Sequence, residues 1–182
     1  MNSTTRYGHD GVVERTNDGG VIRFERELAY SVDDVWDAIT NPERLAEWWL
    51  PFDANITIDL RPGGTMVMEG LGDEPVLMTC EILKVDPPRL LEHTHVGDGA
   101  FMRWELDPTT DGCRLRLSHF VADVPNAIES CYVVGLHASL SRLEPCLAGK
   151  PVAWDWEQFA VDQVAYATLG FAPVPPPADS ET

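Results

Sequence analysis

Residues 113–149 read CRLRLSHFVADVPNAIESCYVVGLHASLSRLEPCLAG, and the spacing of apolar side chains changes within this stretch. Leu115 and Leu117 alternate with arginines, a period of two that is typical of a strand with one buried face. Further along, apolar residues recur on one helical face, at Val133, Leu136, Leu140, Leu143 and Leu147. The pattern predicts a strand followed by one helix of about 22 residues. Gly149 is expected to end it, and Pro145 to kink it or end it a turn earlier.

The segment before this stretch contains further strands. Turn-forming residues divide residues 53–121 into six strands, with breaks at 62–64, 70–73, 86–88, 97–99 and 108–112. Connections this short indicate an antiparallel meander. An earlier alternating run at 21–29 predicts one more strand. Ser31 and Asn41-Pro42 are typical starts of two short helices, and Asp155 of a final helix that reaches about residue 169.

This element order predicts an α+β fold of the helix-grip type. One antiparallel sheet of about seven strands must curve around the long C-terminal helix to bury both apolar faces. We expect a single domain over residues 21–170. Residues 1–20 are polar and predicted to be a flexible N-terminal segment, and the proline-rich residues 171–182 a disordered tail.

Composition excludes several function classes. The chain has 182 residues with a formal net charge of −17, which would repel nucleic acid and anionic membranes. Its four cysteines are far apart, without a C-x-x-C pair, which favours reduced core thiols. No apolar run of about 18 residues or signal peptide is present, so we expect a cytoplasmic protein without membrane association.

Several ordered motifs resemble a known family. Residues 34–49, DVWDAITNPERLAEWW, are similar to the opening signature of the SRPBCC proteins related to the C-terminal domain of the activator of Hsp90 ATPase. Later motifs are similar in the same order, over residues 61–64, 87–94, 103–106, 112–119 and 135–140. The resemblance covers about residues 20–150. It implies the START-like (Bet v 1-like) superfamily and a cavity for a hydrophobic or amphipathic molecule.

The family does not imply one activity, since its members include binding proteins, cyclases, hydrolases and co-chaperone domains. This chain departs from its relatives at Leu136, where they usually carry tryptophan after the helix glycine. The smaller side chain is expected to open volume beneath the helix.

Strand alternation predicts which side chains face the helix. His93 and His95 share a face with Leu91, which should be buried, so both imidazoles are expected to point into the cavity. The same reasoning, together with the helix pattern and the aromatic residues, gives a predicted ligand-binding set of Trp36, Trp49, Met66, Met68, Met78, His93, His95, Met102, Trp104, His119, Val133, Leu136, His137 and Leu140.

The histidines leave three roles open. They could form a polar lining that recognises a ligand, act as acid–base groups near neutral pH, or supply an H-x-H half-site for a metal. His93, His95 and His137 are the catalytic candidates. No Asp or Glu is clearly placed inward to complete a metal shell or to orient an imidazole, so we predict no metal and no cofactor.

Three functional hypotheses follow. The first is a non-enzymatic protein that binds a small hydrophobic or amphipathic molecule. The second is an enzyme of the polyketide cyclase or hydrolase type that uses the cavity histidines. The third is an Hsp90-type co-chaperone module, although such co-chaperones carry an additional domain for which this chain has no room. A homodimer is possible, because an exposed sheet edge can pair across a two-fold axis.

Overall fold

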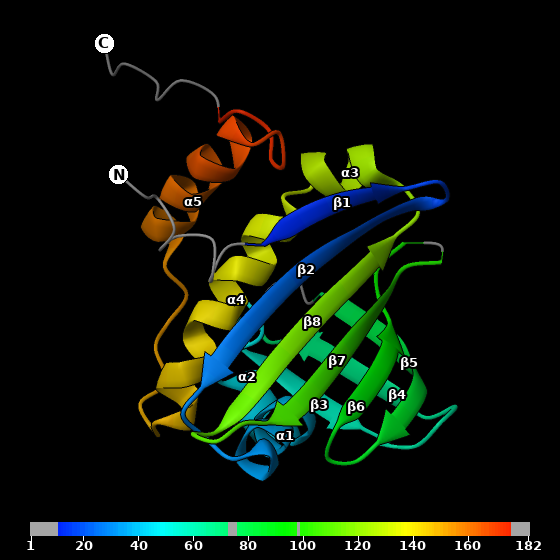
Figure 1. The fold of residues 1–182 in the computed structure, drawn as a ribbon, viewed down its shortest axis with the longest axis vertical. Coiled ribbons are helices and arrows are strands. Elements are labelled where there is room, and N and C mark those ends of the chain that lie inside the picture. The colour runs from blue at the N-terminus through cyan, green and yellow to red at the C-terminus, as the bar shows by residue number, and fades with distance from the viewer. Residues whose placement is uncertain (1–10, 73–75, 98, 176–182) are drawn as a thin grey trace.

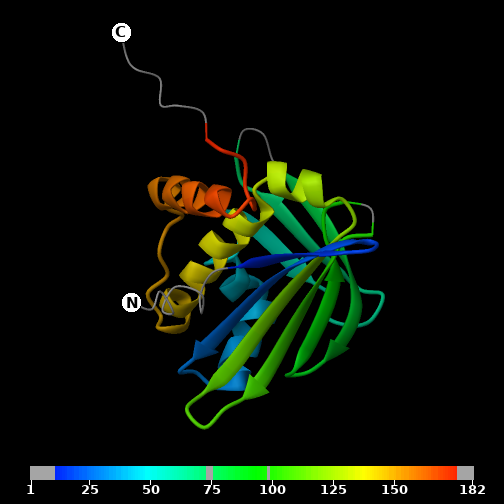
Figure 2. The ribbon, with the colours of Figure 1, turned by 45° about the horizontal axis from the view of Figure 1, so that its top comes forward.

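The computed structural model describes residues 11–72, 76–97 and 99–175. Eight antiparallel strands form one sheet in the order β1-β2-β8-β7-β6-β5-β4-β3, and the sheet curves around α4 (Figures 1 and 2). The strands are β1 Val12–Thr16, β2 Gly19–Leu28, β3 Ala54–Ile58, β4 Thr65–Gly70, β5 Leu77–Asp86, β6 Leu90–Thr94, β7 Phe101–Pro108 and β8 Cys113–Val121. The predicted helix-grip fold is confirmed.

The eighth strand, β1, corrects the prediction for residues 1–20. Val12–Thr16 pairs residue by residue with Gly19–Arg23 through a two-residue turn at Asn17 and Asp18, so this part of the segment is a hairpin. The strand is short and largely exposed, which left no clear apolar alternation to recognise. Residues 1–10 and 176–182, which are half of the first predicted terminal segment and most of the second, lie outside the described residues.

The described residues form five helices: α1 Val32–Thr40, α2 Pro42–Ala46, α3 Val124–Glu129, α4 Tyr132–Leu147 and α5 Trp156–Thr168. Ser31 caps α1 by accepting a hydrogen bond from the Asp34 backbone N–H, and Asn41 caps α2, as the sequence predicts. Asp155 likewise caps α5.

The predicted 22-residue helix is two helices. Cys131 has a positive φ of 55° between α3 and α4, which breaks the right-handed helical path. The apolar stripe begins only at Val133, whereas Val124 and Ala127 of α3 pack in a separate small cluster with Val121. Pro145 lies near the end of α4 and does not end it early, because α4 reaches Leu147.

The core lies between the concave face of the sheet and α4. Across the sheet, Ile82, His93, Met102, His119 and Ile22 lie in one row of paired residues. All five are buried, which confirms that the strand face chosen from alternation is the inner face. The last helix, α5, packs against α4 on the side away from the sheet (Figure 2).

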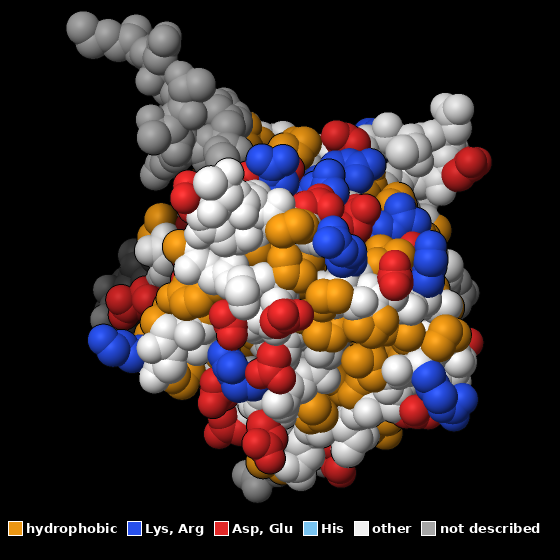
Figure 3. Space-filling model, turned by 60° about the horizontal axis from the view of Figure 1, so that its bottom comes forward, with side chains coloured by type: hydrophobic (Ala, Val, Ile, Leu, Met, Phe, Trp, Pro, Cys, Tyr) orange, Lys and Arg blue, Asp and Glu red, His pale blue; other side chains and the backbone are white. Residues whose placement is uncertain are grey.

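The outer face of the sheet carries paired charges. Arg103 binds Glu92 at 2.6 Å, and Arg116 binds Asp107 on the neighbouring strand. On the face in Figure 3, Lys and Arg side chains lie among Asp and Glu rather than forming one basic area. None of the helices in the described part of the chain has the length and apolarity needed to cross a lipid bilayer.

Candidate functional site

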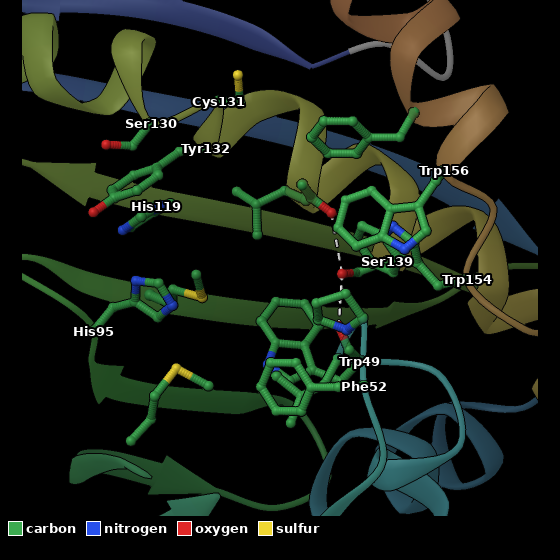
Figure 4. Close-up of a pocket in the computed structure, with 17 residues that line it drawn as sticks. Trp49, Phe52, His95, His119, Ser130, Cys131, Tyr132, Ser139, Trp154 and Trp156 are labelled. Atoms are coloured by element: carbon green, nitrogen blue, oxygen red, sulfur yellow. Dashed lines mark hydrogen bonds between the residues drawn. The ribbon is translucent and has the colours of Figure 1, made fainter. Parts of the chain in front are cut away.

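A cavity of about 320 Å³ opens between the concave face of the sheet, α4 and the segments that flank α2 and α5. Figure 4 shows two groups of side chains, with the imidazoles at one end and large aromatic rings at the other. The lining residues are Trp49, Leu50, Pro51, Phe52, Met78, His95, Met102, His119, Ser130, Cys131, Tyr132, Gly135, Leu136, Ser139, Trp154, Trp156 and Phe159. The wall is therefore mostly apolar, with a few polar atoms.

Three rings form the histidine end. His95 follows β6 and His119 lies on β8, and their ring centroids are 4.7 Å apart in an edge-to-face arrangement. Tyr132, the first residue of α4, stacks on His119 with 5.4 Å between centroids and 20° between planes. The chain reaches this position directly after the positive φ of Cys131. The break between α3 and α4 thus places the tyrosine ring over the imidazole.

Most of the unsatisfied polar atoms in the described residues belong to side chains that line this cavity. Within the described residues, five buried side-chain nitrogens have no hydrogen-bond partner: Nδ1 of His95, both ring nitrogens of His119, Nε1 of Trp154 and Nε of Arg116. Four of the five belong to residues that line the cavity. Buried polar groups are nearly always hydrogen-bonded in folded proteins, so this concentration marks a place where an added group would find partners.

Both imidazoles at this end are neutral near physiological pH. Burial lowers the pKa of His95 to about 4, with a smaller contribution from neighbouring His93. Burial also lowers the pKa of His119 to about 3, and His95 and His93 add to the effect. A neutral imidazole offers one N–H donor and one acceptor nitrogen, and it does not carry the charge needed to attract an anion.

The aromatic end is built from two distant segments. Trp49 and Phe52 follow α2, and Trp154, Trp156 and Phe159 come from the start of α5 and the segment before it. Trp156 is 62% exposed, so its ring lies at the mouth. Trp156 and Phe159 pack edge-to-face at 5.5 Å between centroids.

Hydrogen bonds from α4 hold the first of these segments. The Arg142 guanidinium donates to the backbone carbonyls of Trp48 and Leu50, at 2.9 and 2.7 Å. The Ser139 hydroxyl donates to the carbonyl of Trp49 at 2.7 Å. These contacts fix the backbone on both sides of Trp49, so its ring has a defined place in the wall.

Six of the fourteen predicted ligand-binding residues line the cavity: Trp49, Met78, His95, Met102, His119 and Leu136. Leu136 lies in the cavity wall, and the larger opening expected from it stays a prediction. Whether these six residues contact a ligand stays a prediction.

His93 points inward but does not reach the cavity. Its Nδ1 lies 2.8 Å from the carbonyl of Thr94, and its Nε2 accepts a hydrogen bond from the Trp104 indole at 3.1 Å. Both nitrogens are therefore used within the protein, which defines the neutral Nδ1–H tautomer. Burial lowers the pKa of His93. Neither His93 nor Trp104 is in the lining, because each is engaged with the other in the packed wall.

His137 also lies outside the cavity, on the side of α4 that faces α5. Its Nδ1 is 2.8 Å from the hydroxyl of Tyr166, and its Nε2 is 4.0 Å from a carboxylate oxygen of Asp162. The Tyr166 hydroxyl also accepts the backbone N–H of Gly11 at 2.6 Å. His137 therefore ties α4 to α5 and to the start of β1.

The remaining predicted residues pack in the core away from the cavity: Trp36, Met66, Met68, Val133 and Leu140. An inward orientation brings a side chain to the interior, but these five residues lie where the described interior is filled rather than at the cavity. The interior is also filled where Trp48, Trp49 and Trp104 pack edge-to-face with centroids 5.2 to 6.2 Å apart.

Sequence reasoning missed a large part of the aromatic lining. Tyr132, Phe52, Trp154, Trp156 and Phe159 all line the cavity and were not predicted. The run WDWEQF at 154–159 was a usable signal, because three aromatic residues gather within six positions at a helix start. Within the described residues, no three His, Cys, Asp or Glu side chains are grouped so as to hold a metal ion.

Comparisons with known proteins place this geometry in a family. The family model described as Activator of Hsp90 ATPase homolog 1-like protein matches residues 29–148. No curated protein matches the chain significantly. Both the fold and the family expected from the sequence are confirmed by these comparisons and by the structures below.

Three solved structures illustrate the similarity. CalU16 from Micromonospora echinospora is 24% identical over 88% of this chain and 96% of its own, with a TM-score of 0.68. The protein encoded by BPP1335 from Bordetella parapertussis is 27% identical over 92% and 94%, with a TM-score of 0.64. NE0264 from Nitrosomonas europaea is 25% identical over 71% and 94%, with a TM-score of 0.62.

Proposed function

Since the chain belongs to the family of Activator of Hsp90 ATPase homolog 1-like proteins, we propose that it binds a hydrophobic or amphipathic small molecule in the cavity beneath α4. The observation that carries the proposal is the cavity itself, with its apolar wall and its few polar atoms. Ligand sites in proteins are concave, mostly apolar and furnished with a small number of orienting polar groups. The volume of about 320 Å³ lies at the lower end of the usual range and suits a small ligand.

Binding is favoured over acid–base catalysis by the chemistry of the wall. Of the three catalytic candidates, only His95 lines the cavity. No Asp or Glu is among the described residues of the lining, so no carboxylate there orients an imidazole or stabilises its charged form. The lowered pKa values of His95 and His119 make both imidazoles weak bases at neutral pH.

Filling the cavity tests the proposal. Gly135 lines the cavity from α4, and a Cβ built on it meets no atom within 4 Å. Gly135→Leu therefore places a side chain in open space, and replacing a helical glycine also favours the folded helix. We expect Gly135→Leu to lower the affinity for the neutral dye Nile red at least tenfold. Its thermal unfolding temperature should be retained.

Glu144→Leu is the matched control, because Glu144 is an exposed residue of the same helix outside the lining. It should bind the dye as the unmodified protein does. Native mass spectrometry of the purified protein gives a second readout, with a co-purified small molecule expected in the unmodified protein and absent from Gly135→Leu. Equal dye binding in both variants would contradict the cavity as the binding site.

A further inference from the structure

Among the described residues, His119 is the side chain with two buried, unsatisfied nitrogens. Its side chain is 0% exposed, and neither ring nitrogen has a hydrogen-bond partner among the described residues. Its neighbours are the face of Tyr132 and the edge of His95, which pack against it without satisfying its nitrogens. Leaving a buried donor or acceptor unsatisfied costs about 1–3 kcal/mol. A group that supplied both an acceptor and a donor would recover that free energy.

The charge of the lining limits what that group is. Among the described residues of the lining there is no Asp, Glu, Lys or Arg. A carboxylate or an ammonium group would therefore lose its hydration at the histidine end without gaining an opposite charge. The neutral imidazoles can instead donate to, and accept from, an uncharged hydroxyl, or donate to a carbonyl.

The opposite end limits the shape of the rest of the ligand. Trp49, Phe52, Trp154 and Trp156 bring the faces and edges of large rings to the cavity (Figure 4). Aromatic walls favour flat rings, which stack or meet them edge-to-face with about 0.5–1.5 kcal/mol per pair beyond area burial. Met78 and Met102 also line the cavity, and their flexible side chains adapt to an irregular outline.

From these two ends we infer the ligand class: an uncharged, planar aromatic molecule that bears a hydroxyl or carbonyl group, which reaches His119 beside His95 when the covering rings of His95 and Tyr132 shift to admit it. The flat part lies against the tryptophans toward the mouth. This inference rests on the proposed function, since it names the chemistry of the molecule that the same cavity binds. The recognising element is the His95–His119 pair with Tyr132, and the selecting feature is the uncharged wall around it.

Three probes with the same ring system separate the contributions of the flat rings, the hydrogen-bonding group and the charge: naphthalene, 2-naphthol and 2-naphthoate. They present the same flat rings with no polar group, with a hydroxyl and with a carboxylate. Binding is measured by quenching of tryptophan fluorescence and by calorimetry. We expect 2-naphthol to bind at least tenfold more tightly than naphthalene and 2-naphthoate, because a site with unsatisfied polar groups discriminates against an analogue that lacks the partner.

His119→Leu should remove the preference for 2-naphthol over naphthalene and leave naphthalene binding within about threefold. His119→Gln keeps a donor and an acceptor, so part of the preference should be retained. His137→Leu, which changes an imidazole outside the cavity, should not alter the order of the probes. The probe series on the unmodified protein stands as a test even where a variant is unstable.

The outcomes distinguish the two proposals. Equal or tighter binding of naphthalene, with all binding lost in Gly135→Leu, would overturn the ligand class and leave cavity binding intact. Tightest binding of 2-naphthoate would overturn the uncharged character of the site. Absence of binding by all three probes and by Nile red would contradict the proposed function itself.

Discussion

His93 and His119 lie in the same cross-strand row, on β6 and β8, with only Met102 of β7 between them. Both side chains are almost fully buried, at 2% and 0% exposure. Yet His93 has a partner for each nitrogen, and His119 has none among the described residues. Position in the sheet is therefore equivalent for the two histidines, and the difference comes from what packs over them.

The packed wall, around His93 and Trp104, and the cavity wall, around His119 and Tyr132, differ in whether their buried nitrogens are hydrogen-bonded. In the packed wall, the Trp104 indole donates to His93, so a tryptophan and a histidine satisfy each other. In the cavity wall, Tyr132 covers His119 with its ring face, which excludes water without offering a hydrogen bond in the ring plane. The first region therefore contributes stability, whereas the second leaves buried nitrogens without partners, as expected if it is the proposed binding site, since functional sites often sacrifice local stability.

Acidification should destabilise the cavity wall strongly. An unfolded histidine has a pKa of about 6.5, whereas the folded values are about 4 for His95 and about 3 for His119. Between these values the unfolded state binds more protons, so stability is fully present above about pH 6.5 and is lost as the pH falls. Each of the two histidines should lower the free energy of unfolding by about 1–2 kcal/mol between about pH 6.5 and pH 5.

Urea unfolding at a series of pH values measures this loss. The double variant His95→Gln/His119→Gln should have a shallower dependence over the same interval, since the carboxylates and the other histidines are unchanged in both proteins. An equally steep dependence in the double variant would show that the two cavity imidazoles are not the groups that titrate.

The inner face of the sheet was predictable from sequence, and with it the inward orientation of His93 and His95. Alternation in Leu91-Glu-His-Thr-His95 places His93 and His95 on the side of a residue that must be buried, and in the structure His93 is buried and His95 lines the cavity. The six strands over residues 53–121 followed from turn residues at regular intervals. These features are local, because each depends on residues close together in the chain.

The hollow end was not predictable in the same way. The hydrogen bond from Trp104 to His93 joins residues 11 positions apart, and the contact of Tyr132 with His119 depends on a positive φ at Cys131 that no local pattern required. The aromatic mouth combines residues near 49–52 with residues near 154–159. A cavity is defined by what fails to fill the interior, and this is a property of the whole packing arrangement.

Replacing each histidine of the row by leucine sharpens the comparison directly. His93→Leu leaves the Trp104 N–H without its acceptor and the Thr94 carbonyl without its donor, which should cost about 1–3 kcal/mol in the free energy of unfolding. His119→Leu removes a group that has no partner among the described residues, so stability should be unchanged or slightly higher. Chemical denaturation of the two variants side by side gives the difference, and equal losses would refute the distinction between the two walls.

The smallest expected effect concerns the backbone beside the cavity. Cys131, with its φ of 55°, adopts the left-handed conformation that costs a residue with a Cβ about 1–2 kcal/mol, and it also lines the cavity. Cys131→Gly relieves this cost, although glycine gains more entropy in the unfolded chain. We expect Cys131→Gly to exceed Cys131→Ala by about 0.5–1 kcal/mol in unfolding free energy, and the alanine variant serves as the control for loss of the thiol. A glycine variant less stable than the alanine variant would mean that the turn before α4 carries no strain. The cavity wall would then differ from the packed wall in its hydrogen bonds alone.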